Sequence, residues 1–185
     1  CDVDPARMGE VVEPGGARVV ILQDDFLADV PGVLERLGAN ECVVGIGHNG
    51  VRQRLSDAVG ERLAAPWIDP RAIVSPSVTI EDGTVVLPGV VINAASKIGR
   101  AVILNTSCVI EHDCLIEDGV HVSPGATLCG GVIVRRGAWV GAGATVIPLR
   151  EVGEGATIGA GAAVVKDIPA GVIAVGVPAK PRGEQ

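Results

Sequence analysis

The sequence predicts a parallel β-solenoid preceded by a small α/β domain. From residue 68 to residue 169 an aliphatic residue recurs at every sixth position. Two places before each of these, the residue is usually small or valine, and the other positions are mostly Gly, Asn, Asp, Glu or Pro. Neither a helical period nor a long alternating strand explains this spacing, so the repeating unit is a short strand followed by a tight bend. Three units close a triangular turn of eighteen residues, and the turns stack about 4.8 Å apart.

The repeat also predicts which side chains fill the interior of this prism. The aliphatic series is Ile68, Val74, Ile80, Val86, Ile92, Ile98, Leu104, Ile110, Ile116, Val122, Leu128, Val134, Val140, Val146, Val152, Ile158 and Val164. The small residues that fit where the walls converge include Thr84, Ser96, Cys108, Cys114, Ala126, Ala138, Ala144, Ala156 and Ala162.

Residues 1–66 have a different pattern, in which buried strands alternate with helices. We expect strands at Arg18–Leu22 and Glu41–Ile46, and helices at Pro31–Leu37 and Val51–Val59. Alternation of this kind is typical of a small α/β domain with a parallel sheet.

Two features of this first domain bear on ligand binding. The turn Gly45–Asn49 joins a predicted strand to a predicted helix, where free N–H groups and the helix dipole favour an anion, although a plain connecting turn would look the same. Asp2–Pro5 stands at the start of the chain, without the strand, Gly-rich turn and helix that open a complete nucleotide-binding half. We therefore expect a Rossmann-like domain that is truncated at its N-terminus.

The second domain, residues 67–185, is the solenoid with a C-terminal tail. No loop interrupts the repeat between Trp67 and Asp167, so anything that covers a substrate must come from the first domain or from another subunit. Arg150 occupies a position that is otherwise small or aliphatic, and we expect a local bulge there. The tail Gly176–Arg182 cannot continue the repeat and is expected to fold across the last turn.

Composition narrows the class of protein. The net charge is −7, and this argues against a nucleic-acid partner because little would neutralise phosphates over a long surface. The sequence shows no apolar run long enough to span a bilayer and no signal segment, so we expect no membrane association and a soluble, cytoplasmic protein. Cys108 and Cys114 fall on successive sides of one turn, six residues apart, whereas stacked residues lie eighteen apart. We therefore expect two free thiols that pack in the interior and form no disulfide, consistent with a reducing compartment.

The strongest chemical signal lies at His112, one of three histidines. It follows the inward Ile110 at a bend, where its side chain points outward, and Asp113 beside it can accept from one ring nitrogen and raise the basicity of the other. Eighteen residues further on, Gly130 lies one turn above His112 with an uncovered N–H. A bare amide beside a base can hold a developing oxyanion.

The same spacing places Trp139 above His121 and puts Ala142 and Ala160 in one column. That column lies two sides away from the His112–Gly130 column, so one extended ligand could touch both only in a groove between neighbouring prisms. A cyclic oligomer, most simply a homotrimer, would supply such a groove.

These hexads resemble the hexapeptide-repeat acyltransferases. More narrowly, Asn105–Cys114 followed by His121–Ala126 resembles the nucleotide-amino-sugar and sialic-acid acetyltransferases. The resemblance implies a left-handed parallel β-helix, which departs from the usual right-handed crossover, after a small nucleotide-binding domain. It also implies a trimer that uses acetyl-CoA as co-substrate, with no metal.

The resemblance further assigns residue roles. It implies that His112 is the general base, that Asp113 supports it, and that the Gly130 amide meets the thioester carbonyl. It places Asn105 and His121 in the acceptor pocket.

The resemblance extends to both ends of the co-substrate and to the first domain. Ala142 and Ala160 match backbone contacts to the pantetheine arm, and Lys180 lies in a tail that resembles the one near the adenine. Asp2–Pro5 and Gly45–Asn49 look like the family's second strand end and later strand–turn–helix, so Asp2, Gly47 and His48 are expected to contact the nucleotide sugar.

The leading hypothesis is an acetyltransferase that N-acetylates the 4-amino group of a nucleotide-linked amino sugar by direct attack, with His112 as base. O-acetylation of sialic acid or another sugar hydroxyl is the first alternative, and a non-catalytic scaffold or degenerate remnant is a further one. A carbonic-anhydrase-type metal enzyme would need three ligands. Only His112 and His121 lie on the solenoid, half a turn apart, so we expect no metal site.

Overall fold

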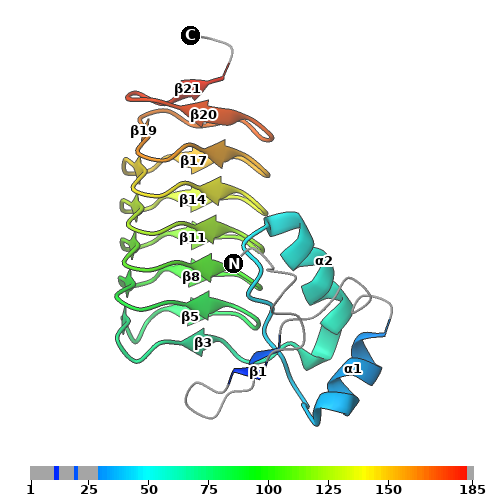
Figure 1. Cartoon of the computed structure of the whole chain (residues 1–185). Coiled ribbons are helices and arrows are strands. Elements are labelled where there is room, and N and C mark those ends of the chain that lie inside the picture. Colours follow the sequence, from blue (N-terminus) through cyan, green and yellow to red (C-terminus); the bar gives the residue numbers. More distant parts are fainter. Residues whose placement is uncertain (1–10, 13–18, 21–28, 183–185) are drawn as a thin grey trace.

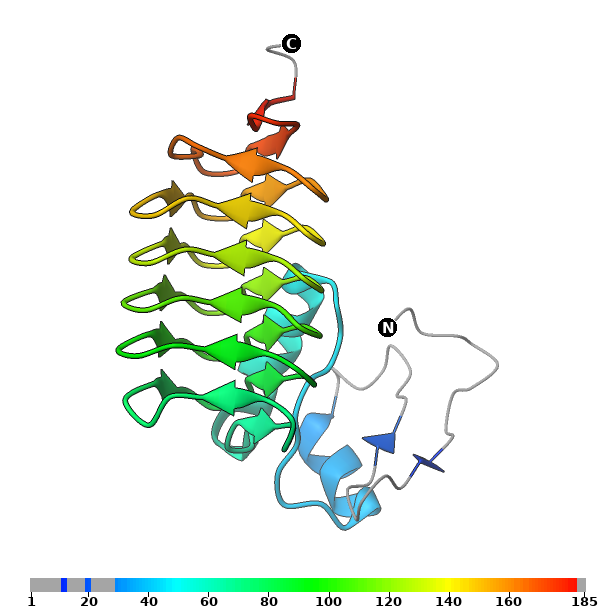
Figure 2. The same ribbon diagram turned by 90° about the vertical axis from the view of Figure 1, so that its left-hand side faces the viewer.

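Short strands separated by tight turns build most of the molecule. The computed structural model describes residues 11–12, 19–20 and 29–182 of the chain. Strands recur every six residues from Trp67 to Val164 and stack into three sheets along one axis (Figures 1 and 2). From β3 to β19, neighbouring strands of a sheet lie eighteen residues apart and pair in parallel, as Val109–Ile110 does with Thr127–Leu128. The period-six prediction of a parallel β-solenoid is confirmed.

The three sheets have six, five and eight strands. The first contains β4 (Ile73–Val74), β7 (Val91–Ile92), β10 (Val109–Ile110), β13 (Thr127–Leu128), β16 (Thr145–Val146) and β19 (Ala163–Val164). The second contains β5 (Thr79–Ile80), β8 (Lys97–Ile98), β11 (Leu115–Ile116), β14 (Ile133–Val134) and β17 (Glu151–Val152). The third contains β3 (Trp67–Ile68), β6 (Val85–Val86), β9 (Ile103–Leu104), β12 (His121–Val122), β15 (Trp139–Val140), β18 (Thr157–Ile158), β20 (Ile173–Val175) and β21 (Lys180–Pro181).

The predicted interior is the observed core. From Val86 to Val164, every aliphatic residue of the series is at most 1% exposed, and the small residues are buried with them. At the open first turn the series is less protected, and Ile68 is 42% exposed. Cys108 and Cys114 are buried free thiols, as expected. Burial raises the pKa of Cys108 to about 12 and also raises the pKa of Cys114, so neither is a ready nucleophile.

The bulge expected at Arg150 is wrong. β14 and β17 pair in unbroken register, Ile133 with Glu151 and Val134 with Val152. The Ile133 N–H donates to the Arg150 carbonyl at 3.0 Å, as in a regular turn. The long side chain reaches outward, with its guanidinium 3.5 Å from the Asp167 carboxylate, and so needs no extra residue in the backbone.

In the N-terminal region the two predicted helices are confirmed, as α1 (Val30–Leu37) and α2 (Asn49–Val59). Asp29 caps α1 by accepting from the Gly32 N–H at 2.9 Å, and Gly38 ends it in the left-handed conformation. A 3₁₀ turn, η3 (Gly60–Arg62), follows α2. Both helices lie beside the lower turns of the solenoid (Figures 1 and 2).

The strand predicted at Arg18–Leu22 is present at Val19–Val20, whereas the strand predicted at Glu41–Ile46 and the parallel pairing are wrong. In Glu41–Ile46 only Cys42 forms a bridge, to Leu63, and the Ile46 carbonyl accepts from Arg52 instead of from a neighbouring strand. β1 (Val11–Val12) and β2 (Val19–Val20) pair antiparallel, not parallel. Residues 13–18 are too few for the crossover of a dozen or more residues that parallel pairing needs. Asp2 lies outside the described residues.

The C-terminal tail closes the upper end of the solenoid. β20 turns back into the antiparallel strand β21, and the Ala179 N–H donates to the Ala163 carbonyl at 2.7 Å. The predicted fold of the tail across the last turn is confirmed. Within residues 11–12, 19–20 and 29–182, no helix combines the length and the apolar character needed to cross a membrane.

Candidate active site

His112 and Asp113 project from the turn between β10 and β11. Ile110 and Cys114, on either side, are buried and hold the backbone, while the side chains of His112 and Asp113 are 63% and 67% exposed. His112 Nδ1 lies 2.8 Å from Asp113 Oδ2. A carboxylate can only accept from this nitrogen, so Nδ1 carries the proton and Nε2 keeps a free lone pair. The pair therefore has the form of a general base.

Gly130 lies against the open side of the His112 ring. A Cβ at Gly130 would be 2.7 Å from both Cε1 and Nε2 of His112, so only glycine permits this approach. The neighbouring peptides are fixed, because the Gly131 N–H donates to the His112 carbonyl at 2.9 Å and the Leu149 N–H to the Gly130 carbonyl at 3.0 Å. Among the described residues, the Gly130 N–H itself has no acceptor.

At the next corner of the solenoid, carboxylate side chains accept hydrogen bonds from two backbone amides at the equivalent position. There Asp118 accepts from the Arg100 N–H at 3.0 Å, and Glu117 accepts from the Arg136 N–H at 2.9 Å. No described carboxylate does this for Gly130. The structure thus brings together a base and a free donor, and this pair can deprotonate a nucleophile and stabilise an oxyanion.

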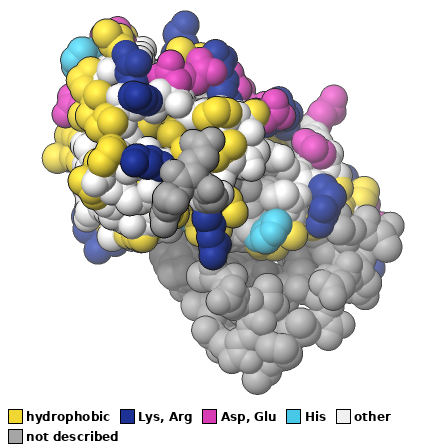
Figure 3. All heavy atoms as spheres, turned by 90° about the horizontal axis from the view of Figure 1, so that it is seen from above, with side chains coloured by type: hydrophobic (Ala, Val, Ile, Leu, Met, Phe, Trp, Pro, Cys, Tyr) yellow, Lys and Arg dark blue, Asp and Glu magenta, His cyan; other side chains and the backbone are white. Residues whose placement is uncertain are grey.

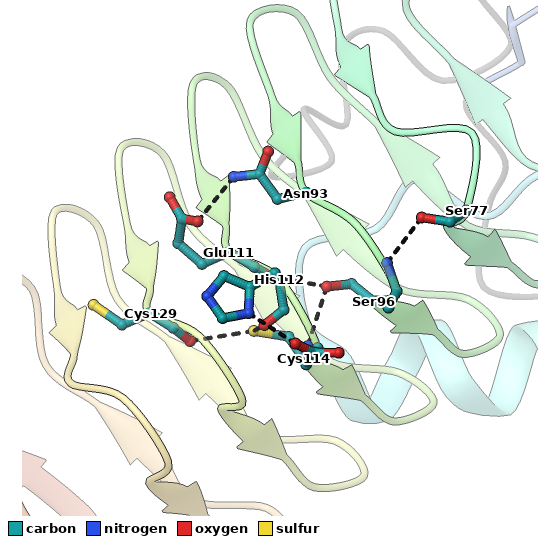
Figure 4. Close-up of polar contacts among 9 residues, drawn as sticks. Ser77, Asn93, Ser96, Glu111, His112, Cys114 and Cys129 are labelled. Carbon is teal, nitrogen blue, oxygen red and sulfur yellow. Dashed lines mark hydrogen bonds and ion pairs between the residues drawn. The ribbon is translucent and has the colours of Figure 1, made fainter.

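Ser96 supports this turn, and the sequence reasoning did not find its role. Its buried hydroxyl donates to the Glu111 carbonyl at 2.7 Å and accepts from the Cys114 N–H at 3.1 Å, so it spans the turn that carries His112 (Figure 4). Asn93 also donates to the Glu111 carboxylate at 2.9 Å. A serine in the small interior slot looks in sequence like any other packing residue.

A second cluster lies on the third sheet, around His121. As predicted, Trp139 stacks on His121, with ring centroids 5.7 Å apart and planes inclined by 6°. His121 Nδ1 lies 3.3 Å from the Gly47 carbonyl and Nε2 lies 3.1 Å from Asn105 Nδ2. The carbonyl can only accept, so Nδ1 donates to it and Nε2 accepts from the amide.

Burial keeps His121 neutral, although its hydrogen bond to the Gly47 carbonyl acts in the opposite direction. Burial lowers its pKa to about 4, and the nearby Arg52 guanidinium acts in the same direction. The side chain is only 7% exposed, whereas Trp139 remains 45% exposed, with its indole N–H donating to Ser123 at 2.7 Å. Asn105, His121 and Gly47 therefore do meet, and Trp139 is the open surface of their cluster.

Arg52 ties this cluster to the first domain, a role that the sequence did not reveal. It is fully buried on α2 and donates to the carbonyls of Ala101, Gly119 and Val120 on the solenoid at 2.7 to 3.2 Å. It also donates to the carbonyls of Ile46 and Gly47 and to the side chain of Asn49. Burial lowers its pKa to about 10, so it stays charged at neutral pH. An arginine on a predicted helix is usually a surface residue, so the sequence did not indicate that Arg52 is buried against the solenoid.

The remaining predicted site residues lie elsewhere. His48 caps α2, and its Nδ1 accepts from the Val51 N–H at 3.3 Å, which occupies one of the amides expected to hold an anion. Ala142 and Ala160 are exposed at successive turns of a third corner, and the Gly161 N–H donates to the Ala142 carbonyl at 2.8 Å. Lys180 is exposed on β21. Within one chain, none of these residues joins His112 and Gly130.

Metal ligands do not gather in the part of the chain that the structure describes. No three His, Cys, Asp or Glu side chains there lie close enough to hold an ion. The site is therefore built from one imidazole, one carboxylate and one peptide amide.

The period-six solenoid and the turn that carries His112 define a hexapeptide-repeat β-helix. Comparison with solved structures places the chain among acetyltransferases with this fold. A perosamine N-acetyltransferase from Caulobacter crescentus, solved as a histidine-to-asparagine mutant with CoA and GDP-perosamine, is 40% identical, with a TM-score of 0.81 over 91% of this chain and 79% of that chain. The acetyltransferase domain of PglB from Neisseria gonorrhoeae, in complex with acetyl coenzyme A, is 35% identical, with a TM-score of 0.80 over 97% of this chain and 84% of that chain. The chain belongs to the hexapeptide-repeat acyltransferase family.

A curated relative agrees with this assignment. GDP-perosamine N-acetyltransferase from Escherichia coli O157:H7 is 35% identical over 98 residues, which is 52% of this chain and 44% of the relative. The match thus spans less than half the length of that relative. No protein-family model matches the chain.

Proposed function

We propose that this protein is an acetyl-CoA-dependent N-acetyltransferase that acts on a nucleotide-linked 4-amino sugar. The observation that carries the proposal is the packing of Gly130, whose amide has no acceptor among the described residues, against the ring of His112, which is hydrogen-bonded to Asp113. GDP-perosamine is the first acceptor to test, because the relatives solved with it share 40% of their residues with this chain.

In the proposed mechanism, the neutral amine of the sugar attacks the carbonyl carbon of the thioester. A C–N bond forms, and the carbonyl oxygen gains a negative charge that the Gly130 N–H stabilises. His112 Nε2 takes the proton that the nitrogen loses, while Asp113 stabilises the imidazolium. The C–S bond then breaks, and CoA leaves as a thiol after receiving that proton. The products are the acetamido sugar and CoA, with no covalent enzyme intermediate.

A histidine in this role has support from relatives as well as from geometry. Two solved structures of the Caulobacter protein are mutants in which one histidine is replaced, by asparagine in one and by alanine in the other, and both hold CoA and GDP-perosamine. Cys108 and Cys114 are unsuited to covalent catalysis because burial raises the pKa of both thiols.

We also propose that the working unit is a homotrimer with each site between two subunits. The His112 turn joins the first and second sheets, whereas Asn105, His121 and Trp139 line the third sheet. One chain alone therefore offers the base and the acceptor cluster on different sides. Large apolar side chains are also exposed on the solenoid, and in the axial view of Figure 3 hydrophobic side chains reach the surface along one edge, while most of the visible acidic ones line another. Packing between copies would cover such apolar groups.

A thiol-release assay with acetyl-CoA and a panel of nucleotide-linked amino sugars tests the activity. His112→Ala should lower kcat by about 10²- to 10⁴-fold, the usual contribution of a general base. Glu154→Ala is the matched control, because Glu154 is exposed on another corner of the solenoid. Turnover of His112→Ala near the wild-type rate would sink the mechanism.

Mixing two inactive variants tests the shared site. His112→Ala and Asn105→Ala, unfolded and refolded together in equal amounts, should recover about a quarter of the active sites if base and acceptor cluster come from different subunits. If each site lay within one chain, the mixture would stay inactive.

A further inference from the structure

Leu149 combines a left-handed backbone angle, which the solenoid turn adopts at this position, with a large exposed apolar side chain. Its φ is 60°, in the left-handed region that costs a non-glycine residue free energy, and its side chain is 72% exposed. The other described non-glycine residues at such angles are small or polar: Ala95, Ala101, Ser107 and Asp113. Because the turn itself sets this angle at each corner, the unusual feature of position 149 is the choice of a large apolar side chain where the equivalent positions carry glycine or a small or polar residue.

The position of Leu149 connects it to the reacting centre. Its N–H donates to the Gly130 carbonyl at 3.0 Å, so it lies one turn above Gly130 and Gly131. Its Cδ2 is 2.7 Å from the place where a Cβ on Gly131 would be. The leucine side chain therefore folds down over Gly131 and fills the space that this glycine leaves open, beside the Gly130 amide.

The residue before Leu149 provides no backbone hydrogen-bond donor at this corner. Pro148 stands above Gly130 in the same column and has no N–H. Going up the corner from His112, a ligand carbonyl meets the Gly130 donor first, and then the apolar surface of Pro148 and Leu149. That sequence of surfaces suits a thioester, which has one polar oxygen and an apolar acyl group.

We propose that Leu149 forms the apolar wall of the acyl subsite and restricts the donor to a short acyl chain. The inference rests on the proposed function, because it takes the Gly130 amide as the contact of the thioester carbonyl. A leucine folded over Gly131 narrows the space beside the Gly130 amide, and this favours a methyl group over a longer chain. One methylene in an apolar pocket changes discrimination by about tenfold or more.

Binding and turnover of acetyl-CoA, butyryl-CoA and free CoA by wild type and Leu149→Ala test this role. The variant should raise the affinity for butyryl-CoA relative to acetyl-CoA by about tenfold, with the same change in the kcat/KM ratio. Its affinity for free CoA should stay within about twofold, because free CoA carries no acyl group. Leu149→Gly removes the side chain and also relieves the backbone, so it provides a second, more stable variant with the same expected shift.

Ala95→Gly is the matched control. Ala95 occupies the same left-handed position of the same corner, with φ 62°, three turns below Leu149. It should leave the acyl preference unchanged, which separates relief of strain from loss of the wall. If the ratio of the affinities for butyryl-CoA and acetyl-CoA is unchanged in both Leu149 variants, the inference is overturned. This holds also if sedimentation shows that the oligomeric state of the variants has changed.

The outcomes also separate this inference from the proposed function. Wild-type protein that binds acetyl-CoA but acetylates no amino sugar would refute the proposed acceptor, while the binding ratio would still decide the role of Leu149. Wild-type protein that binds neither thioester would overturn both.

Discussion

Replacing Gly130 by alanine tests the closest contact of the candidate site. The added Cβ would lie 2.7 Å from Cε1 and Nε2 of His112, and ordinary contact begins near 3.4 Å. The ring must therefore retreat by about 0.7 Å, which pulls Nδ1 away from its 2.8 Å contact with Asp113. The Gly130 N–H itself is retained, and its backbone angle is one that alanine can adopt.

A displacement near 1 Å from the reactive geometry can cost about a hundredfold in rate, so kcat of Gly130→Ala should fall by about this factor in the CoA-release assay. The His112 ring is 63% exposed and free to move, so the free energy of unfolding should change by no more than about 0.5 kcal/mol. The double variant with His112→Ala should be no slower than His112→Ala alone, because the alanine acts through the ring. Wild-type kcat in Gly130→Ala, or a further loss in the double variant, would refute this reasoning.

Four other measurements follow from the same structure. Asp113→Asn keeps the left-handed turn, since asparagine tolerates it, but removes the charge that supports His112, so kcat should fall at least about tenfold without loss of folding by circular dichroism. Arg52→Met should destabilise the protein by about 3 kcal/mol in urea unfolding because several buried carbonyls lose their donor; a change below about 1 kcal/mol would contradict the clamp role. The pKa of His121 is lowered to about 4, so on acidification the unfolded state takes up this proton before the folded state does. The stability that neutral His121 contributes is therefore present above about pH 6.5 and is lost between about pH 6.5 and pH 4. His121→Gln should show a shallower decline of Tm over that range. The thiol of Cys108, with its pKa raised to about 12, should resist a disulfide reagent at pH 8 until the protein is unfolded; fast labelling of the native protein would contradict its burial.

The solenoid could be predicted almost completely because its contacts are periodic. From β3 to β19, each strand pairs with the strands eighteen residues away, so one spacing fixes the core, the register and the neighbours of a side chain there. Counting along the sequence put Gly130 over His112 and Trp139 over His121, and both contacts are present. The bulge at Arg150 was a wrong prediction because side-chain size alone does not decide whether a long residue turns outward.

The first domain and its contact with the solenoid could not be predicted in the same way. Arg52 binds carbonyls 49 to 68 residues away, and no repeat relates those positions. The segment Glu41–Ile46 has the composition of a strand, but strand formation needs a neighbour, and only Leu63 bridges to it among the described residues. Tertiary contacts of this kind override local preference.

The regular stacking gives the solenoid a fixed axial length for each turn. Every turn adds about 4.8 Å between the His112 corner and the tail at β21, and no insertion breaks the scale. Deleting one whole turn, residues 133–150, would leave the register of the remaining strands intact and bring the tail closer by one division. Under the proposed function, the number of turns between Gly130 and the tail sets the length of donor that fits between them, and the backbone alone fixes that spacing.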